Sequence, residues 1–383
     1  MNIGIFTDTY HPQINGVVTS ALMLERELGK LGHKVYVFTT TDPNVKTKSP
    51  RVFRLPSMPL IFLKTHRLTF FYPPKLIVRV KKFKLDIVHT YSEFPLGFFG
   101  KLISFVYRIP MIHTYHSMYE DYVHYVANGH LITQNGAKRF SRVFCNYARA
   151  VVAPAEKTRK YLLEIGVKRP IRMIPTGLDF GPFDPLNYPT EERDAARREF
   201  GLNDSDKIII TVGRVAKEKS MDVLVGMMPA LLKSEPKAML LIIGDGPARE
   251  LLSQQADLLG VGRSVIFAGF RPWEEIGKYY RMADIFMTAS TSETQGLTYI
   301  EAMASRIPVV VKNDPSFANV IRDGETGYLF ENDGDAASAA ARALANIDEA
   351  RNAAERGFDA IQSFSAQTFA KRVEDLYMEY ARR

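Results

Sequence analysis

Short apolar runs alternate with longer amphipathic stretches through most of the chain. A run of about four to eight apolar residues between turn signals predicts a buried strand, and apolar positions three to four residues apart predict a helix. In the first half, strands are expected at Asn2–Phe6, Lys34–Thr39, Arg51–Leu55, Asp86–His89, Pro110–His113, Ala150–Ala153 and Ile171–Ile174. Helices are expected at Val17–Leu31, Pro95–Tyr107 and Gln134–Tyr147. This alternation predicts βαβ units with parallel strands.

The same alternation restarts in the second half. Strands are expected there at Ile208–Gly213, Ala238–Ile243, Ser264–Ala268, Ile285–Thr288 and Pro308–Val311, with helices between them. The stretch Leu178–Asn203 is rich in Pro, Gly, Asp and Asn, which predicts a hinge. The Ala-rich chain from Ala336 onward predicts helices, and Phe364–Tyr380 has the pattern of a terminal amphipathic helix.

The chain is therefore expected to fold as two α/β domains, each a doubly wound, Rossmann-like parallel sheet. We expect an amino-terminal domain over residues 1–180, a second domain over residues 181–365, and a terminal helix over residues 366–383 that packs back toward the first domain. Ligands of such sheets bind at the carboxyl ends of the strands, so the cleft between the domains is the expected site. A periplasmic-type binding protein or a two-domain dehydrogenase would share this architecture.

Composition indicates where such a protein works. Its hydrophobic fraction of 46% and charged fraction of 24% are typical of a globular protein. The single cysteine, Cys145, excludes an internal disulfide and a cysteine-based zinc site, which indicates a reducing compartment. The start of the chain lacks the features of a secretory signal, and no stretch approaches ~18 uninterrupted apolar residues. We therefore expect a cytoplasmic protein.

Charge is distributed unevenly along the chain. The net charge is +8, but residues 1–180 carry 26 Lys and Arg against 11 Asp and Glu, whereas the remainder carries 24 against 31. A strongly basic half suggests an anionic partner, which on charge alone is nucleic acid, anionic lipid or an acidic small molecule.

Two loops that follow predicted strands have residues suited to anions. In Thr7–Gly16, TDTYHPQING, Gly16 lets an anion or a sugar oxygen approach the backbone where a helix starts. The loop lacks the GxGxxG pattern, which disfavours a dinucleotide enzyme. In Gly213–Ser220, GRVAKEKS, Arg214 and Lys219 stand where two cations can clamp a diphosphate. Taken alone, the first would also suit an ordinary turn and the second a solvated loop.

The segment SETQGLTYIEAMA, beginning at Ser292, carries the strongest signal. Gly296 marks a helix start, where the N–H groups of Gly296 and Leu297 can face an anion. Glu293 precedes that start and can accept hydrogen bonds from sugar hydroxyls, and Glu301 lies more than one turn inside the helix. A capped amphipathic helix with glutamates in its first turns is the alternative.

Four features together resemble the retaining glycosyltransferases of family 4, which have the GT-B fold. They are GRVAKEKS, the IGDGP at Ile243–Pro247, the spacing from Glu293 to Glu301, and PVV followed by GETGYLF. The resemblance covers essentially the whole chain and implies two Rossmann-like domains facing a central cleft, with the nucleotide-sugar in the second. The donor-binding residues it implies are Gly16, Arg214, Lys219, Glu293, Gly296, Leu297 and Glu301. Arg214 and Lys219 would contact the diphosphate, Glu301 the ribose, and Glu293 the transferred sugar.

The segment HTYHSMYEDYVHY, from His113 to Tyr125, bears on the acceptor. His116 matches the pocket histidine of the family, so the resemblance implies that His116 and Glu293 are catalytic; a buried polar group of the core is the alternative for a single histidine. The segment also resembles, more narrowly, bacterial 1,2-diacylglycerol 3-glucosyltransferases, which implies a lipid acceptor. The acceptor-side residues are then expected to be Tyr119, Glu120, Asp121 and Tyr122.

The stretch Leu60–Asp86 combines basic and apolar side chains. It has seven cations and no acid before Asp86, and its apolar residues include Phe62, Phe70, Leu76, Ile77 and Phe83. Such a segment suits the headgroup layer of an anionic membrane, unless it is a surface helix whose apolar side packs on the core. The expected membrane contacts are Lys64, Arg67, Lys75, Arg79, Lys81, Lys82 and Lys84. Nucleic acid is disfavoured, because no helix-turn-helix, RNP or zinc pattern accompanies the charge.

The sequence thus predicts a hexosyltransferase that moves glucose from UDP-glucose to 1,2-diacylglycerol with retention, peripherally bound to the inner face of the cell membrane. No metal or other cofactor is expected, because cations and a helix start neutralise the leaving diphosphate. A glycosyltransferase acting on phosphatidylinositol or on an existing glycolipid is the alternative, and a non-catalytic two-lobed sugar-binding protein is the alternative of another class. Two features depart from the family: Ser220 replaces a usual glycine, and NDPSFANV from Asn313 replaces a Gly-Gly-x-x-Glu loop.

Overall fold

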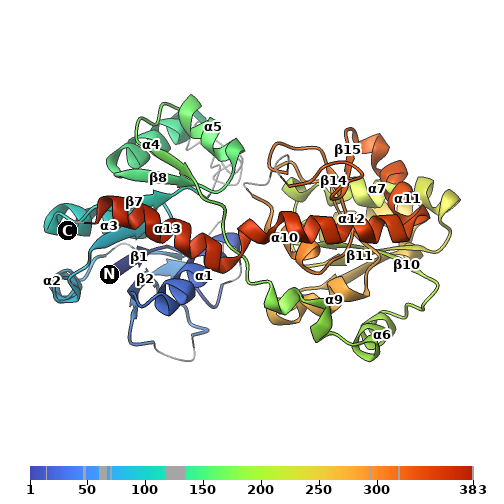
Figure 1. Cartoon of the computed structure of the whole chain (residues 1–383), viewed down its shortest axis with the longest axis horizontal. Coiled ribbons are helices and arrows are strands. Elements are labelled where there is room, and N and C mark those ends of the chain that lie inside the picture. Colours follow the sequence, from blue (N-terminus) through green and yellow to red (C-terminus); the bar gives the residue numbers. More distant parts are fainter. Residues whose placement is uncertain are drawn as a thin grey trace. The chain divides into compact units, whose positions relative to one another are not determined.

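The computed structural model describes residues 1–13, 15–45, 49–59, 67–69, 71–116, 134–292, 295–317 and 320–381. The chain divides into two compact units, one of Met1–Leu178 with Phe364–Arg383 and one of Asp179–Ser363. Each unit is built around its own parallel sheet (Figure 1).

The first unit has a seven-stranded sheet in the order β3-β2-β1-β6-β7-β8-β9, and all of its strands are parallel. The strands are β1 (Asn2–Phe6), β2 (Lys34–Thr40), β3 (Val52–Leu55), β6 (Ile87–Thr90), β7 (Met111–Thr114), β8 (Ala150–Ala153) and β9 (Ile171–Met173). β6, β7 and β8 are buried along their whole length; β8 (AVVA) is apolar throughout, whereas β6 (IVHT) and β7 (MIHT) each end in a buried histidine and threonine. Two short strands, β4 (Met58–Pro59) and β5 (Arg67–Leu68), pair separately and antiparallel.

Helices cover both faces of this sheet. They are α1 (Gly16–Lys30), α2 (Pro74–Phe83), α3 (Pro95–Tyr107), α4 (Gln134–Tyr147), α5 (Glu156–Glu164) and α13 (Ala366–Tyr380). Helices α2 to α5 share one apolar core with the sheet, through residues such as Val80, Phe99 and Leu162. On the other face, α13 from the end of the chain lies beside α1 from its beginning, and Leu24 and Val373 belong to the same core (Figure 1).

The second unit has a six-stranded parallel sheet in the order β12-β11-β10-β13-β14-β15. The strands are β10 (Lys207–Val212), β11 (Ala238–Ile243), β12 (Val265–Gly269), β13 (Ile285–Thr288), β14 (Val309–Lys312) and β15 (Tyr328–Phe330). The helices are α6 (Thr190–Glu199), α7 (Met221–Ser234), α8 (Arg249–Leu258), α9 (Ile276–Met282), α10 (Leu297–Ala304), α11 (Ala336–Ala345) and α12 (Ile347–Ala360). Leu224 of α7, Leu252 of α8 and Ala340 of α11 pack in one core with the sheet.

These elements confirm the predicted fold of two doubly wound parallel sheets, and each predicted strand is present within one or two residues of its expected ends. Two of the features that were not predicted are β15 and α6. β15 was not predicted, because its three residues are too few to show a period. The stretch expected as a hinge contains α6, which begins with Glu191 and Glu192 and ends with Arg197 and Arg198, as the helix dipole favours.

Candidate functional site

Two loops of the second unit meet at the carboxyl ends of neighbouring strands. Because β10 and β13 pair in parallel, the loop Gly213–Ser220 after β10 and the loop after β13 leave the sheet at the same edge. The Ser292 hydroxyl donates to the Glu218 carbonyl at 2.7 Å, and the Ser290 hydroxyl donates to the same carbonyl at 3.4 Å. The structure thus brings together two motifs that the sequence keeps 74 residues apart.

Arg214 and Lys219 lie on the first of these loops. Arg214 is exposed, and its Nη1 atom lies 3.6 Å from a carboxylate oxygen of Glu218. Lys219 is half-buried and ends the 3-10 turn Lys217–Lys219. Both cations are therefore at the edge of the sheet where ligands of this fold bind, and guanidinium and ammonium groups there suit phosphate oxygens.

The IGDGP motif after β11 has a structural role beside this loop. Gly244 has a φ of 134°, and a Cβ atom there would lie 1.8 Å from the Gly213 carbonyl oxygen. A Cβ atom at Gly246 would lie 2.3 Å from the Val215 carbonyl oxygen. Only glycine permits such a close approach of two backbones, so the motif holds the Arg214 loop against the loop after β11.

Ser220 has a left-handed backbone, with a φ of 49° and a ψ of 38°. Glycine adopts this conformation readily and other residues do so at a cost, which explains the glycine usual at this place in the family that the chain resembles. The serine side chain makes no hydrogen bond to the start of α7 among the described residues.

Ser220→Gly is expected to stabilise the protein by about 0.5–1 kcal/mol. A left-handed non-glycine residue costs ~1–2 kcal/mol, and the greater unfolded-state freedom of glycine offsets ~0.5–1 kcal/mol of that gain. Thermal unfolding measures the difference. Ser220→Ala, which keeps the Cβ atom, is the control and should bring no gain; a glycine variant no more stable than the alanine variant would contradict this account.

Gly296 and Leu297 form the start of α10. Gly296 has a φ of 74°, and a Cβ atom there would lie 2.9 Å from the Tyr299 ring and 3.2 Å from the Phe317 ring. The cap residue Gly296 has no side chain that could accept a hydrogen bond, and the first N–H groups of a helix have no partner within it, so this helix start is suited to an anion.

Glu301 lies within α10 and is buried. The Tyr280 hydroxyl donates to its Oε2 atom at 3.0 Å, and the Trp273 ring N–H donates to its Oε1 atom at 3.4 Å. Burial raises the pKa of Glu301 to about 7, although both hydrogen bonds favour the charged form. Tyr280 and Trp273 were not predicted as part of a site. The sequence offered one hint, which is that Trp273 is the only tryptophan of the chain.

His116 lies in the first unit, two residues after the end of β7. Its ring stacks on the Tyr91 ring, with 5.0 Å between centroids and 23° between planes. Burial, and next the neighbouring His113, lower the pKa of His116 to about 3, so the ring is neutral at physiological pH. Its Nε2 atom is buried and has no hydrogen-bond partner among the described residues. It can therefore bind a hydroxyl of a ligand.

Gly16 is exposed and is the first residue of α1, as expected. Asn15 precedes it, and the Asn15 side chain accepts a hydrogen bond from the Val18 N–H at 3.0 Å. One of the free N–H groups expected at this helix start is thus satisfied by the protein itself.

Asp8, a buried carboxylate that was not predicted as part of a site, lies just after the carboxyl end of β1. The Ser92 hydroxyl donates to Asp8 at 2.5 Å, and the Leu96 N–H donates to both Asp8 oxygens at 3.2 Å. Burial raises the pKa of Asp8 to about 7 against these hydrogen bonds. Asp8 therefore ties the loop after β1 to the start of α3.

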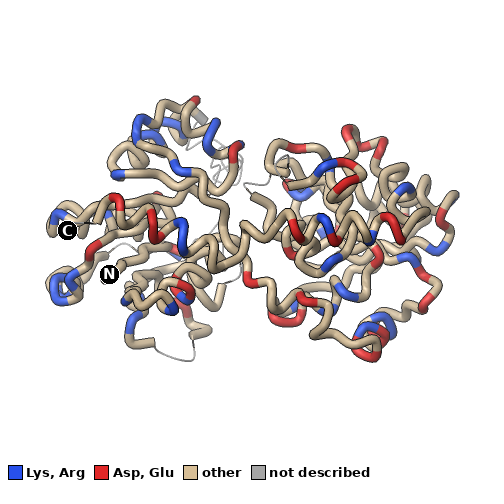
Figure 2. Tube along the Cα trace, viewed as in Figure 1, with Lys and Arg blue, Asp and Glu red and all other residues tan. Residues whose placement is uncertain are grey.

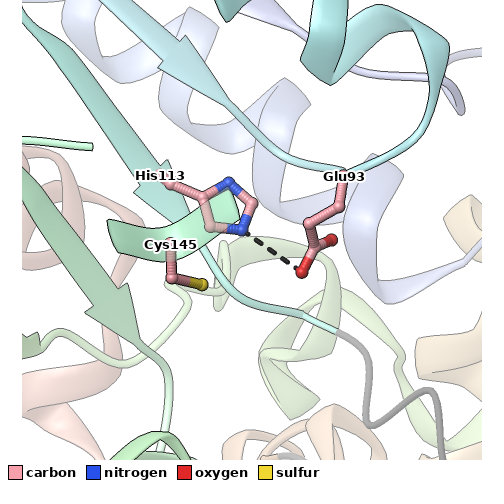
Figure 3. A group of neighbouring side chains, drawn as sticks. All are labelled: Glu93, His113 and Cys145. Atoms are coloured by element: carbon pink, nitrogen blue, oxygen red, sulfur yellow. Dashed lines mark ion pairs between the residues drawn. The ribbon is translucent and has the colours of Figure 1, made fainter. Parts of the chain in front are cut away.

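Glu93, His113 and Cys145 form a buried group in the same unit (Figure 3). Their ligand atoms lie within 4.8 Å of one another, and His113 Nε2 is 3.5 Å from Glu93 Oε1. Burial, and then the Glu93 charge, raise the pKa of the Cys145 thiol well above its usual value, and it is the thiolate that binds metals. The group therefore fits a buried histidine–carboxylate pair beside a neutral thiol better than a metal centre.

Four of the seven cations expected at a membrane lie on α2, where Figure 2 shows cations and no acid. Lys75, Arg79, Lys81 and Lys82 are exposed on α2, and Lys84 is exposed after it. Arg67 instead donates hydrogen bonds to Ser57, at 3.1 Å and 2.8 Å.

The apolar side of α2 corrects an expectation. Leu76, Ile77 and Phe83 were expected at a membrane, but they pack against the apolar core of the first unit together with the buried Val80. Several predicted site residues lie outside the described residues: Lys64, Tyr119, Glu120, Asp121, Tyr122 and Glu293.

Comparison with known families and proteins identifies relatives along the whole chain. Residues 14–181 match the family profile Glycosyltransferase Family 4, and residues 192–359 match Glycosyl transferases group 1. The chain is 38% identical over 380 residues to an alpha-monoglucosyldiacylglycerol synthase of Streptococcus pneumoniae, covering 99% of this chain and 86% of that protein. It is 33% identical over 389 residues to the enzyme of the same name from Acholeplasma laidlawii, covering 99% and 97%.

Solved structures show the same fold. Anabaena HepE in complex with UDP and glucose aligns with a TM-score of 0.79 at 16% identity, covering 98% of this chain and 99% of that chain. WaaG, a glycosyltransferase involved in lipopolysaccharide biosynthesis, aligns with a TM-score of 0.74 at 15% identity, covering 98% and 99%. These structural alignments establish the GT-B fold, and at such low sequence identity they establish the fold alone.

Proposed function

The chain belongs to glycosyltransferase family 4, and from that premise we propose that it transfers glucose from UDP-glucose to 1,2-diacylglycerol to make a membrane glycolipid. The observation that supports diacylglycerol as the acceptor is the similarity to two enzymes named alpha-monoglucosyldiacylglycerol synthase. The similarity covers 99% of this chain and 86% and 97% of the two relatives. The UDP and glucose bound in the complex of Anabaena HepE support the donor.

The donor residues of the second unit support this assignment by their placement. Arg214 and Lys219 would hold the diphosphate together with the N–H groups at the start of α10. Glu301, deep in α10, would accept hydrogen bonds from the two ribose hydroxyls.

In the reaction itself, Glu293 and His116 would orient the glucose. Because the low pKa of His116 keeps its ring neutral, it would act through a hydrogen bond and not through charge. The acceptor hydroxyl would attack from the face that the diphosphate leaves, with retention at the anomeric carbon. Its proton would pass to the leaving phosphate, so that UDP departs with the bond electrons and the glucosyl–oxygen bond forms on the lipid.

A basic face of the first unit supports peripheral membrane binding. Helices α2, α3 and α4 lie on one side of the sheet and contain no Asp or Glu. Their exposed cations are Lys75, Arg79, Lys81, Lys82, Arg139 and Arg142. Their exposed apolar side chains are Val78, Phe98, Phe105, Val106, Phe140 and Val143. We refer to these side chains, with Lys84, as the basic face; cations beside exposed rings suit an anionic bilayer surface.

Among the described residues, none of the helices combines the length and the apolarity needed to cross a membrane. In this proposal the protein meets its lipid substrate through the basic face. Phe98 on α3 and Phe140 on α4, whose ring centroids are 6.0 Å apart, form the apolar centre of the contact.

The proposed function is tested by incubating the purified protein with a panel of radiolabelled nucleotide-sugars and vesicles that contain one candidate acceptor each. We expect transfer of glucose from UDP-glucose to diacylglycerol. Transfer to phosphatidylinositol or to a glycolipid, with none to diacylglycerol, would show that the acceptor is that lipid and not diacylglycerol. No transfer to any lipid would favour a non-catalytic sugar-binding protein.

EDTA is expected to leave the activity largely intact. Arg214, Lys219 and the start of α10 supply the positive charge that the leaving diphosphate needs, so a divalent cation is not required for that purpose. Initial rates with and without EDTA measure this. Complete loss of activity, restored by magnesium or manganese, would contradict it.

The affinity for uridine is expected to fall about tenfold between pH 8 and pH 6. With a pKa of about 7, Glu301 is mostly ionised at pH 8 and about nine-tenths protonated at pH 6, and the protonated acid is the poorer acceptor for ribose hydroxyls. Uridine is the suitable probe because it has no phosphate that titrates in this range.

Calorimetric titration across this pH range is the measurement, and Glu301→Gln is the control. Glutamine does not ionise, so the uridine affinity of the variant should be weak and independent of pH. If the uridine affinity of the parent protein did not change with pH, Glu301 would not be a ribose contact.

A further inference from the structure

The second unit has a cavity of about 260 Å³ at the edge of its sheet opposite the Arg214 loop. Asp284 and Pro308, which directly precede β13 and β14, lie at its base, so it is at the amino ends of the strands. The carboxyl end of α9 and the residues after α10 line it, together with side chains of α6 and α12.

Arginines dominate the lining of this cavity. Five line it, Arg193, Arg197, Arg281, Arg306 and Arg351, with two carboxylates, Asp284 and Glu355. Each carboxylate already has an arginine: Arg197 lies 3.2 Å from Asp284, and Arg306 lies 2.6 Å from Glu355. Positive charge in excess of the carboxylates therefore remains in the cavity.

That excess is carried by Arg193, Arg281 and Arg351. Burial lowers the pKa of Arg281, and the charges of Arg193 and Arg351 lower it further, so both of these guanidinium groups are close enough to repel that of Arg281. Arg351 also has an exposed contact of 3.7 Å with Asp348, outside the cavity lining. An anion between the three would turn this repulsion into attraction.

Two buried polar atoms of the lining residues make no hydrogen bond among the described residues. The Arg281 Nε atom and the Ser305 hydroxyl are both buried, and neither has a hydrogen-bond partner among the described residues. Ser305 is only 3% exposed. A buried donor without a partner is costly, and an oxyanion in the cavity would accept from both groups.

We propose that this arginine cavity is a binding site for a phosphate-bearing anion, separate from the donor site. Guanidinium groups form paired hydrogen bonds with phosphate oxygens, and several of them converge here with a hydroxyl donor. The cavity is smaller than the ~300–1,000 Å³ of sites for drug-sized ligands, so it suits a phosphate group with a small substituent. The site takes either a soluble phosphate compound or the phosphate of a lipid headgroup.

The test is calorimetric titration of the full-length protein with inorganic pyrophosphate while saturating UDP occupies the donor site. We expect one further binding event, weakened at least tenfold by Arg281→Gln and by Arg193→Gln, since a lost charge-assisted hydrogen bond costs about that much. Arg263→Gln removes an exposed arginine next to β12, three strands away from β13, and is the matched control that should bind like the parent. UDP affinity, unchanged in all three variants, shows that they are folded.

No binding of pyrophosphate beside UDP would overturn the proposal. So would equal binding by the parent and Arg281→Gln, or equal weakening by Arg281→Gln and Arg263→Gln, which would indicate only general charge attraction. Ser305→Ala provides an independent check and should also weaken pyrophosphate binding.

Two further ligands distinguish the sources of the phosphate. Glycerol 3-phosphate in solution and vesicles of phosphatidylglycerol are offered in parallel to the parent and to Arg281→Gln. If the variant loses affinity for glycerol 3-phosphate but sediments with the vesicles like the parent, the site takes soluble phosphate compounds. If vesicle binding falls as well, it takes the lipid headgroup.

Discussion

Replacing Glu293 with glutamine is expected to lower turnover about 100-fold, in line with other losses of a single transition-state contact, while UDP affinity stays nearly unchanged. Glutamine preserves the shape of the side chain but removes the charge that binds the sugar hydroxyls. The transferred sugar, and not the nucleotide, should therefore lose its contact. Steady-state rates with vesicles of diacylglycerol, together with UDP titrations, separate the two effects.

Glu301→Ala is the matched comparison and should affect the other step. It removes an expected ribose contact and leaves Tyr280 and Trp273 without their acceptor, so UDP binding itself should weaken by ~1–3 kcal/mol. If UDP titrations of the Glu293 and Glu301 variants were indistinguishable, the roles assigned to the two carboxylates would be wrong.

The strands and most helices could be predicted because each is specified by its own residues. β8 (AVVA) and β11 (AMLLII), for example, are buried along nearly their whole length and therefore consist of apolar runs that are unusual in loops. The hinge region shows the limit of such patterns. Pro, Gly and Asp precede α6, and Gly and Asn follow it, so averaging over that stretch hides the helix-forming sequence TEERDAARRE inside it.

The donor loops could be predicted for a different reason. Glycines such as Gly244, Gly246 and Gly296 are needed where backbones approach closely or adopt a positive φ, so they mark the turns that hold the site. The residues around Glu301 carry no such mark. Trp273 and Tyr280 lie 28 and 21 residues before it, and only the packing of α9 and α10 brings them to the carboxylate.

The arginine cavity could not be predicted from the sequence at all. Its arginines stand at positions from 193 to 351; four of them look like the ordinary surface charge of an amphipathic helix, and Arg306 lies in the turn after α10. The place of the apolar residues of α2 could not be predicted for a related reason. The apolar side of a membrane-facing helix and that of a core-packed helix repeat with the same period. The structure shows that α2 uses Leu76, Ile77 and Phe83 in the core, and its cations remain exposed.

The exposure of these cations makes the basic face testable. Reversing Lys81, Lys82 and Lys84 to glutamate is expected to weaken binding to anionic vesicles at least 100-fold, since each cation near such a surface contributes ~1 kcal/mol and the new charges are repelled. The three side chains are exposed, so the fold should survive the change. Raising the salt concentration should release the parent protein as well, because screening limits surface charges to ~8 Å at physiological ionic strength.

The control is a variant with the same change in charge on the second unit: Lys233, Lys237 and Arg263, which are exposed and have no ion pair among the described residues, reversed to glutamate. Co-sedimentation with phosphatidylglycerol vesicles should be lost in the first variant and kept in the control, and UDP affinity should be unchanged in both. An enzyme that meets its acceptor in the bilayer should lose turnover on vesicles in the first variant and keep it on detergent-dispersed diacylglycerol. Should both variants sediment like the parent, α2 is a core-packed surface helix only, and the membrane contact lies elsewhere on the chain.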